Sequence, residues 1–228
     1  MRSLRGHFIT FEGGEGAGKS TQIKRLAELL RKNGVEVLIT REPGGSPGAE
    51  AIRHVVLSGA AKTLGPEMEA ILFAAARSDN VEQVIKPALE AGTTVLCDRF
   101  MDSSRVYQGV SGGVDPDFIL SMERAVTEGA RPDLTLVFDL PVELGLKRAA
   151  EVWADDGPDR FESDELEMHE KRRQGFLQIA EDEPDRCVVI DASQPLDDVS
   201  HDVDEAVGAY LKRKKLEEAR NRRSKSST

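Results

Sequence analysis

The stretch that decides the fold is GGEGAGKS, which runs from Gly13 to Ser20 and fits the pattern G-x-x-x-x-G-K-[ST]. It follows the short, β-rich run His7–Glu12 and leads into Lys19–Lys32, whose apolar residues recur at helical spacing. Glycines let successive backbone N–H groups turn toward a phosphate, and the N-terminus of the following helix adds its positive end. Because the stretch lies between a strand and a helix, we predict a phosphate-binding loop for a nucleoside triphosphate.

The side chains at the end of this loop carry the chemistry. Lys19 is expected to reach the β- and γ-phosphate oxygens of the nucleoside triphosphate, and the hydroxyl of Ser20 is expected to ligate Mg²⁺. The residues predicted to contact the triphosphate here are Gly13, Gly14, Glu15, Gly16, Ala17, Gly18, Lys19, Ser20 and Thr21. The motif alone does not distinguish a kinase from a GTPase or a motor.

Outward from the loop, short apolar runs alternate with amphipathic segments along the whole chain. This alternation is typical of a parallel sheet that is covered by helices on both faces. We therefore predict an α/β, three-layer P-loop NTPase fold with a parallel five-stranded sheet. The expected strands are His7–Glu12, Val35–Thr40, Thr93–Cys97, Leu134–Asp139 and Cys187–Ile190. The expected helices are Lys19–Lys32, Pro66–Ala91, Asp115–Glu128, Pro141–Trp153, Ser163–Glu181 and Leu196–Leu211.

Charge divides the chain of 228 residues unevenly. The formal net charge is −10, yet residues 212–228 alone carry +6, which leaves −16 on the rest. We expect one domain over residues 1–211 and a basic, flexible tail over 212–228, since no linker or repeat divides the chain. The acidic body argues against stable nucleic-acid binding. The tail could touch nucleic acid or an anionic surface, but a solvated chain end is the preferred interpretation.

Hydrophobicity also excludes some classes of protein. No window approaches 18 uninterrupted apolar residues, so we expect no membrane span, and the first apolar patch is too short for a signal-peptide core. A cytoplasmic protein is the resulting expectation. Cys97 and Cys187 each lie in a strand-like run and are expected to be buried and reduced. His169 and His201 lie in charged stretches and are expected at the surface.

The end of the third predicted strand narrows the class of enzyme. An N-K-x-D segment, which would read guanine, is absent from the sequence. The strand ends in Asp98-Arg99, where Asp98 can hold Mg²⁺ through water. The neighbouring cation is better suited to binding a second anionic substrate than to activating water. A kinase for a small phosphorylated acceptor explains this arrangement best.

Several segments together closely resemble those of bacterial thymidylate kinases. They occur in the family's order over about residues 7–212, and their combination is highly specific. The main segments are FEGGEGAGKST at Phe11–Thr21, TREPGG at Thr40–Gly45, LFAAAR at Leu72–Arg77, DRF at Asp98–Phe100 and SSRVYQG at Ser103–Gly109. Further matches are Arg131–Thr135, Gly145–Ala149 and Asp191–Ser193.

The resemblance implies transfer of the γ-phosphoryl group of ATP to thymidine monophosphate (dTMP), giving dTDP for dTTP synthesis. On matching positions, Arg99 would bind the acceptor phosphate, since a planar guanidinium can donate two parallel hydrogen bonds. Asp98 would position Mg²⁺ between donor and acceptor, and Glu15 would accept a hydrogen bond from the 3′-hydroxyl of the deoxyribose. Lys19 would balance the charge of the moving phosphoryl group.

The resemblance also implies how the acceptor nucleoside is recognised. Phe73 would stack on the pyrimidine and Arg77 would donate to a ring carbonyl. Ser104 and Gln108 would read the remaining edge of the base, and Tyr107 would fill the space beside C2′ and disfavour a ribose hydroxyl.

The far side of the acceptor pocket would be shaped by Glu42, Pro43 and Arg53, with a cis bond before Pro43. By spacing alone, Phe73 would be a core residue, and Arg53 and Arg77 would be solvated cations on helix faces. Only the resemblance to the family assigns these residues to the binding of the acceptor nucleotide.

Family members are commonly homodimers, which makes a homodimer the expected assembly. The apolar positions of Pro66–Ala91 could serve either the core or a dimer face. They are Ile71, Leu72, Val81, Val84 and Ile85.

The chain departs from the family in the lid, about residues 148–162, which folds over ATP in relatives. Bacterial relatives with glycine at the Gly16 position carry several arginines in the lid. Here its middle has three acidic residues: Glu151, Asp155 and Asp156. We therefore expect Arg160 to stabilise the transferred phosphoryl group and Arg148 to pack near the adenine.

Two alternatives stay open. One is a kinase for another deoxynucleoside monophosphate or for pyrimidine nucleotides in general, which an assay across the nucleoside monophosphates would separate. The other is a weakly active nucleotide-binding or DNA-associated module, which salt-sensitive DNA binding without phosphoryl transfer would indicate.

Overall fold

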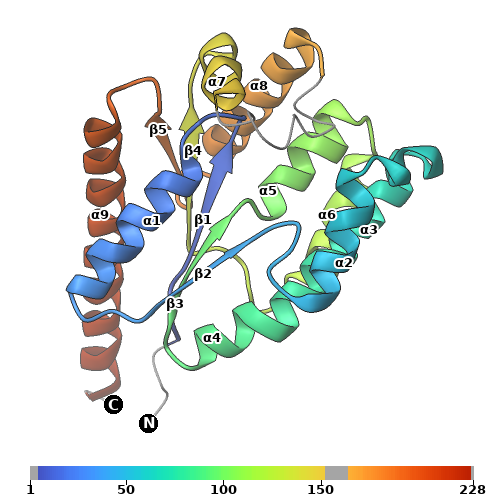
Figure 1. Ribbon diagram of the computed structural model, residues 1–228. Helices are drawn as coiled ribbons and strands as arrows, with labels where there is room; N and C mark the ends of the chain where they lie inside the picture. Colours follow the sequence, from blue (N-terminus) through green and yellow to red (C-terminus); the bar gives the residue numbers. More distant parts are fainter. Residues whose placement is uncertain (1–4, 152–163, 227–228) are drawn as a thin grey trace.

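The computed structural model describes residues 5–151 and 164–226, and its centre is a five-stranded parallel sheet (Figure 1). The strands are β1 (Phe8–Gly13), β2 (Val37–Arg41), β3 (Thr94–Asp98), β4 (Leu134–Asp139) and β5 (Cys187–Asp191). Their order in the sheet is β2-β3-β1-β4-β5, and every neighbouring pair is parallel. The predicted α/β fold with a parallel five-stranded sheet is confirmed.

Helices connect the strands and cover the two faces of the sheet. They are α1 (Lys19–Lys32), α2 (Pro47–Leu57), α3 (Pro66–Asn80), α4 (Lys86–Glu90), α5 (Met101–Ser104), α6 (Pro116–Val126), α7 (Val142–Ala150), α8 (Leu166–Asp182) and α9 (Leu196–Ser226). Short segments of other helical geometry are η1 (Ala60–Leu64), η2 (Val81–Ile85) and η3 (Arg105–Ser111). None of the helices in the described part of the chain is both long and apolar enough to cross a bilayer.

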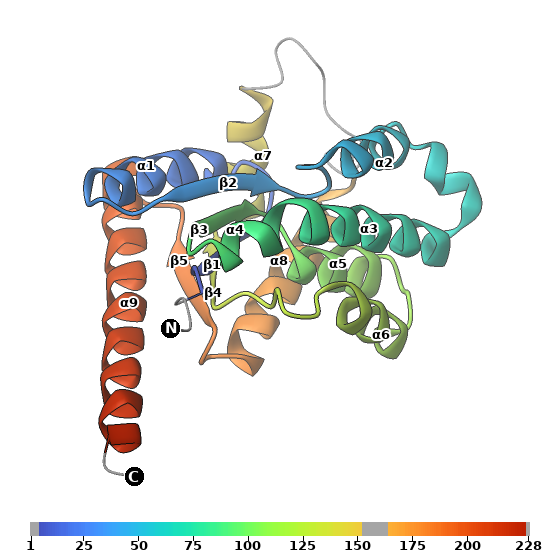
Figure 2. The same cartoon turned by 90° about the horizontal axis from the view of Figure 1, so that it is seen from below.

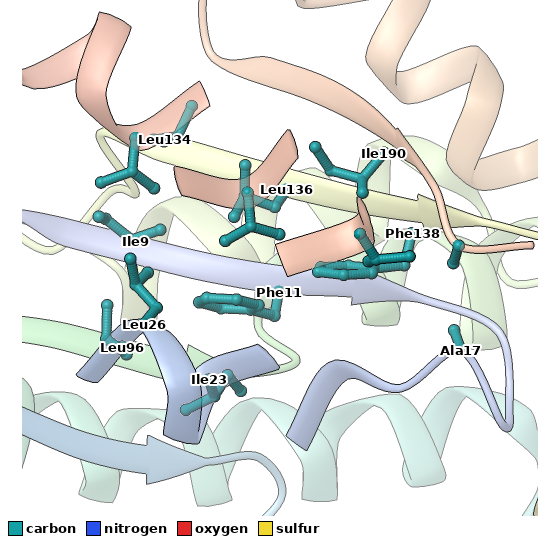
Figure 3. Packing of buried hydrophobic residues seen from close by; sticks show 14 of the residues in the cluster. Ile9, Phe11, Ala17, Ile23, Leu26, Leu96, Leu134, Leu136, Phe138 and Ile190 are labelled. Atoms are coloured by element: carbon teal, nitrogen blue, oxygen red, sulfur yellow. The ribbon is translucent and has the colours of Figure 1, made fainter. Parts of the chain in front are cut away.

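The hydrophobic core forms two layers because alternate residues of each strand point to opposite faces. On one face, Ile9 and Phe11 of β1 and Leu136 of β4 pack against α1 and α9 (Figure 3). On the other face, Phe8 of β1 packs with η2 and α4, while Val137 of β4 packs with η3 and α8. Both faces are therefore buried, and the continuous apolar runs of the strands follow from this burial.

The register of the sheet aligns the ends of three strands. Phe11 of β1 and Arg41 of β2 both lie opposite Asp98 at the end of β3. Because all strands run parallel, the segments that follow β1, β2 and β3 emerge at one edge of the sheet. Ligands of open α/β sheets bind outside this carboxyl edge.

The structure corrects some expectations from the sequence. The closing helix was predicted to end at Leu211, which was wrong: α9 continues to Ser226, and Figure 2 shows its end lying away from the other helices. Residues 212–226 contain no glycine or proline and are rich in Lys, Arg and Glu, which favour helix. The flexibility of 212–228 stays a prediction.

Buried and exposed positions were predicted with mixed success. Cys97 and Cys187 are both free and buried, as expected. His201 is exposed, but His169 is only 7% exposed, so the surface expectation for His169 was wrong. His169 lies on α8, and its charged sequence neighbours concealed that its own position faces the body of the protein.

A network of ion pairs joins the end of α8 to the segments near η3. The carboxylate of Glu183 accepts hydrogen bonds from Arg105 at 2.5 Å, Arg131 at 2.7 Å and Arg186 at 2.9 Å. Burial by itself would raise the pKa of Glu183, but hydrogen bonds from Arg186 and Arg105 lower it to about 2. Arg186 also donates two hydrogen bonds to the fully buried Asp102.

We expect Glu183→Gln to destabilise the protein at neutral pH by about 1–2 kcal/mol, since the carboxylate is partly exposed to solvent. A lowered pKa stabilises the fold above the ordinary value of 4.5, and this contribution is lost as the pH falls toward 2. The difference between wild type and variant should therefore shrink below pH 4.5 in denaturant titrations. Exposed Glu181→Gln is the matched control, and a difference that is independent of pH would contradict the assignment.

Candidate active site

The phosphate-binding loop has the backbone that its glycines were predicted to allow. Gly16 has a φ of 63°, and an added Cβ there would lie 1.9 Å from the carbonyl oxygen of Gly145 on α7. A side chain at position 16 would therefore displace α7. Lys19, at the start of α1, donates from Nζ to the carbonyl oxygens of Gly13 at 3.1 Å and Gly14 at 2.7 Å. The lysine is thus held over the loop where the phosphates would lie.

Ser20 and Asp98 meet beside the loop. The hydroxyl of Ser20 donates to Oδ2 of Asp98 at 2.6 Å. Hydroxyl and carboxylate oxygens suit Mg²⁺, which keeps several waters and shares its other positions with substrate phosphates. Within residues 5–151 and 164–226, no group of three or more His, Cys, Asp or Glu side chains could hold a metal by itself. The donor set thus fits a magnesium ion that arrives with a nucleotide.

A cavity of about 640 Å³ extends from the loop along α1. Its walls include residues 15–22 of the loop and α1, together with Arg148 on α7 and Ala192 after β5. Nη1 of Arg148 donates to the carbonyl oxygen of Ala192 at 2.7 Å, so the two wall residues are joined. Arg148 thus lines this cavity, and its packing near the adenine stays a prediction. We call this space the donor cavity.

A second cavity, of about 300 Å³, opens on the other side of the loop. It is lined by all ten side chains that were predicted to bind the acceptor: Glu15, Glu42, Pro43, Arg53, Phe73, Arg77, Arg99, Ser104, Tyr107 and Gln108. The bond between Glu42 and Pro43 is cis, as expected. We call this space the acceptor cavity.

Arg99 lies where the two cavities meet, directly after β3. It has a φ of 64°, and it is the only residue other than glycine with a positive φ in the part of the chain that the structure describes. Its guanidinium donates to Oε1 of Glu15 at 2.6 Å and to the carbonyl oxygen of Gly13 at 3.1 Å. A left-handed arginine is strained and persists only where its surroundings fix it.

Glu12 fixes this turn, and it was not among the residues predicted from the sequence. Its buried carboxylate accepts hydrogen bonds from the backbone N–H of Phe100 at 2.8 Å and from the hydroxyl of Ser103 at 2.6 Å. Burial, together with the nearby charge of Asp102, raises the pKa of Glu12 to about 7. A carboxylate at the end of an otherwise apolar strand was the available signal in the sequence.

Glu15 connects the loop to the acceptor cavity. Its Oε1 accepts from Arg99 and also from the hydroxyl of Tyr107 at 2.7 Å. Burial would raise the pKa of Glu15, but the charges of Arg99 and Lys19 outweigh it and lower the pKa to about 2. Glu15 is therefore a carboxylate at neutral pH and can accept a hydrogen bond from a sugar hydroxyl.

Arg77 is fixed at the inner end of the acceptor cavity. It is 4% exposed. It donates to Oε2 of Glu42 at 2.6 Å, to the hydroxyl of Ser104 at 3.1 Å and to the carbonyl oxygen of Phe100 at 2.9 Å. A guanidinium has five N–H donors, so these bonds orient the group and leave donors for a ligand. Arg53 donates to the carbonyl oxygen of Pro43 at 2.7 Å and so supports the opposite wall.

The donor and acceptor cavities share four lining residues: Glu15, Ser20, Asp98 and Arg99. The structure therefore brings together the predicted loop, the pair predicted to ligate Mg²⁺ and the residues predicted to bind the acceptor. Arg160, Asp155 and Asp156 lie outside the described residues, whereas Glu151 is exposed at the end of α7. The geometry is that of a site in which two ligands meet at the carboxyl edge of the sheet.

Comparisons with known proteins agree with this geometry. A family model described as Thymidylate kinase matches residues 11–203. A protein described as "Thymidylate kinase" from Bradyrhizobium sp. (strain ORS 278) is 57% identical over 207 residues, which cover 91% of this chain and 92% of the relative. A second protein of the same description, from Bradyrhizobium sp. (strain BTAi1 / ATCC BAA-1182), has the same identity and coverage.

Proposed function

Because the chain belongs to the thymidylate kinase family, we propose that it transfers the γ-phosphoryl group of ATP to dTMP, giving dTDP and ADP for dTTP synthesis. The observation that carries this proposal is the meeting of the donor and acceptor cavities at Glu15, Ser20, Asp98 and Arg99. Two nucleotides in these cavities would point their phosphates at each other, which a phosphoryl transfer requires.

The protein's own residues act by binding and orienting. Lys19 and the backbone of the loop hold the triphosphate, and Arg99 holds the acceptor phosphate. Glu15 and Tyr107 contact the sugar, while Phe73 and the fixed Arg77 hold the base. The hydrogen bonds of Arg77 to Glu42, Ser104 and Phe100 orient its guanidinium, which limits the reorganisation needed when a base binds.

We also propose that Mg²⁺ accompanies ATP, held by Ser20 and Asp98. When bound, the ion neutralises charge that develops on the phosphoryl oxygens during transfer. The hydrogen bond from Ser20 to Asp98 holds the two oxygen donors close together.

The activity is tested by ATP consumption in a coupled assay with dTMP, compared with UMP and the other nucleoside monophosphates. We expect rapid ADP formation with dTMP and much slower formation with UMP, because Tyr107 occupies the space beside C2′. Equal rates with all acceptors would contradict the assignment of dTMP as substrate.

We propose Arg160 as the lid residue that stabilises the transferred phosphoryl group. An arginine near this group can contribute about 10³–10⁵ in rate, so Arg160→Ala should lower kcat by at least about tenfold. Steady-state kinetics with saturating ATP and dTMP measure this effect, and Arg124→Ala, on the exposed side of α6, is the control. A smaller loss in Arg160→Ala would show that another group carries the role.

We further propose that the protein is a homodimer. Val81 and Ile85 are fully buried in the core, so they are not available for an interface. Met68 and Ile71 of α3 are 43% and 40% exposed and lie one turn apart on the helix. Light scattering should therefore give twice the chain mass of 25.0 kDa, and a monomer mass would contradict this assembly.

A further inference from the structure

We infer that Glu69 is a positioning residue that fixes the amide of Gln108, so that the acceptor cavity selects bases with an N3–H donor over cytosine. The inference rests on the proposed function, because it concerns the base of the acceptor nucleotide. It starts from one contact: Nε2 of Gln108 donates to Oε1 of Glu69 at 3.3 Å.

Both side chains of this contact are removed from solvent. Gln108 on η3 is 3% exposed, and Glu69 in the first turn of α3 is 8% exposed. Gln108 also lines the acceptor cavity, together with Arg77 and Ser104. The contact therefore joins a wall residue of the cavity to a carboxylate that does not line it.

The chemistry of the two groups fixes the orientation of the amide. A carboxylate offers only acceptors, whereas a glutamine amide has a donating NH₂ end and an accepting oxygen. Reversing the amide would place two acceptors against each other inside the protein, where an unsatisfied polar group is destabilising. Glu69 thus holds the NH₂ end, and the oxygen is left for a ligand.

This orientation matches thymine and uracil but not cytosine. Thymine carries carbonyl oxygens on either side of its N3–H, so it offers an acceptor to Arg77 and a donor to the oxygen of Gln108. Cytosine has an unprotonated N3, so it would place acceptor against acceptor at Gln108. Its amino group stands in place of O4, so it would also place donor against donor where Arg77 faces that position of the ring. A site whose buried polar groups are left unpaired rejects a ligand strongly.

The test is the binding of dTMP, dUMP and dCMP to the full chain, measured by isothermal titration calorimetry for wild type and Glu69→Gln. The substituted amide can donate or accept, so Gln108 becomes free to reverse. We expect the preference for dTMP over dCMP, as a ratio of Kd values, to fall at least about tenfold. The ratio of dTMP to dUMP should stay unchanged, because both bases carry N3–H.

Further variants distinguish an effect on the amide orientation of Gln108 from a general disturbance of the fold. Glu67→Gln changes an exposed carboxylate in the same helical turn and should leave all ratios unchanged. Glu69→Asp keeps an acceptor-only group and should retain more of the preference than Glu69→Gln. In a Gln108→Ala background, Glu69→Gln should have no further effect on the ratio, because the residue through which it acts is gone.

The results that would overturn the role of Glu69 differ from those that would overturn the proposed function. A folded Glu69→Gln variant whose dTMP to dCMP ratio stays within about twofold of wild type would overturn the inference. If Glu69→Gln does not fold, an unchanged ratio in Gln108→Ala would overturn it, because Gln108 is the residue through which Glu69 is inferred to act. Wild-type protein that phosphorylates no dTMP would instead overturn the proposed function.

Discussion

Replacing Arg99 by alanine is expected to lower kcat/KM for dTMP by about 10³-fold or more, with little change in the KM for ATP. The guanidinium lies where the donor and acceptor cavities meet and is aimed by its bonds to Glu15 and to the carbonyl oxygen of Gly13. Its planar group can bind two phosphate oxygens at once, which no neighbouring side chain of the acceptor cavity can replace in the same position.

Two comparisons make this result specific. Arg99→Lys keeps the charge but loses the two-pronged geometry, so it should recover only part of the activity. Arg124→Ala removes an exposed arginine from α6 and should leave kcat/KM unchanged. A loss of less than about tenfold in Arg99→Ala would mean that another cation binds the acceptor phosphate.

The second large effect is expected for Asp98→Asn, which should abolish measurable turnover. The substitution keeps the shape of the side chain and an oxygen that can accept from Ser20, but it removes the charge that holds a divalent cation. Circular dichroism should show an unchanged fold. Removing Mg²⁺ with a chelator should likewise stop the wild-type reaction, and added Mg²⁺ should restore it.

Asp117→Asn is the control for this substitution, because Asp117 lies exposed in the first turn of α6. Normal turnover in Asp98→Asn would refute the role of Asp98 in binding the metal. Turnover that is lost together with the circular dichroism signal would assign Asp98 to folding, since its backbone ends β3.

The parts of the site that follow one another along the chain could be predicted from the sequence. The loop Gly13–Ser20 has a fixed spacing because consecutive backbone groups hold the phosphates. Asp98 and Arg99 are recognisable because they directly follow an apolar strand. The strands of the sheet could also be predicted from neighbouring residues, since each strand is a largely apolar run.

Residues whose partners lie on distant segments of the chain could not be predicted from local sequence patterns. Arg77 would be a solvated cation by its helical spacing, yet Glu42, Ser104 and Phe100 from other elements enclose it. Glu69 meets Gln108 only because α3 and η3 pack together. The resemblance to a family identified Arg77 and Gln108, but nothing in the sequence pattern points to Glu69.

Two helical segments were not predicted from the spacing of apolar residues. No bounds were predicted for α2, which begins at Pro47-Gly48, a pair that reads as a turn, and only Ala49 and Val56 of α2 are buried. The position of this helix depends on its contacts with α3. The segment of α5 and η3, whose helical geometry changes after Ser104, was likewise left without bounds.

The left-handed turn at Arg99 has a consequence for protein design. An arginine placed at the end of a strand in an unrelated scaffold would relax to an ordinary backbone and aim its guanidinium elsewhere. A design would therefore have to transfer three parts together: the end of the strand, the turn, and the buried Glu12 that binds Phe100 and Ser103. A scaffold that receives all three parts should bind anions better than one that receives the arginine alone.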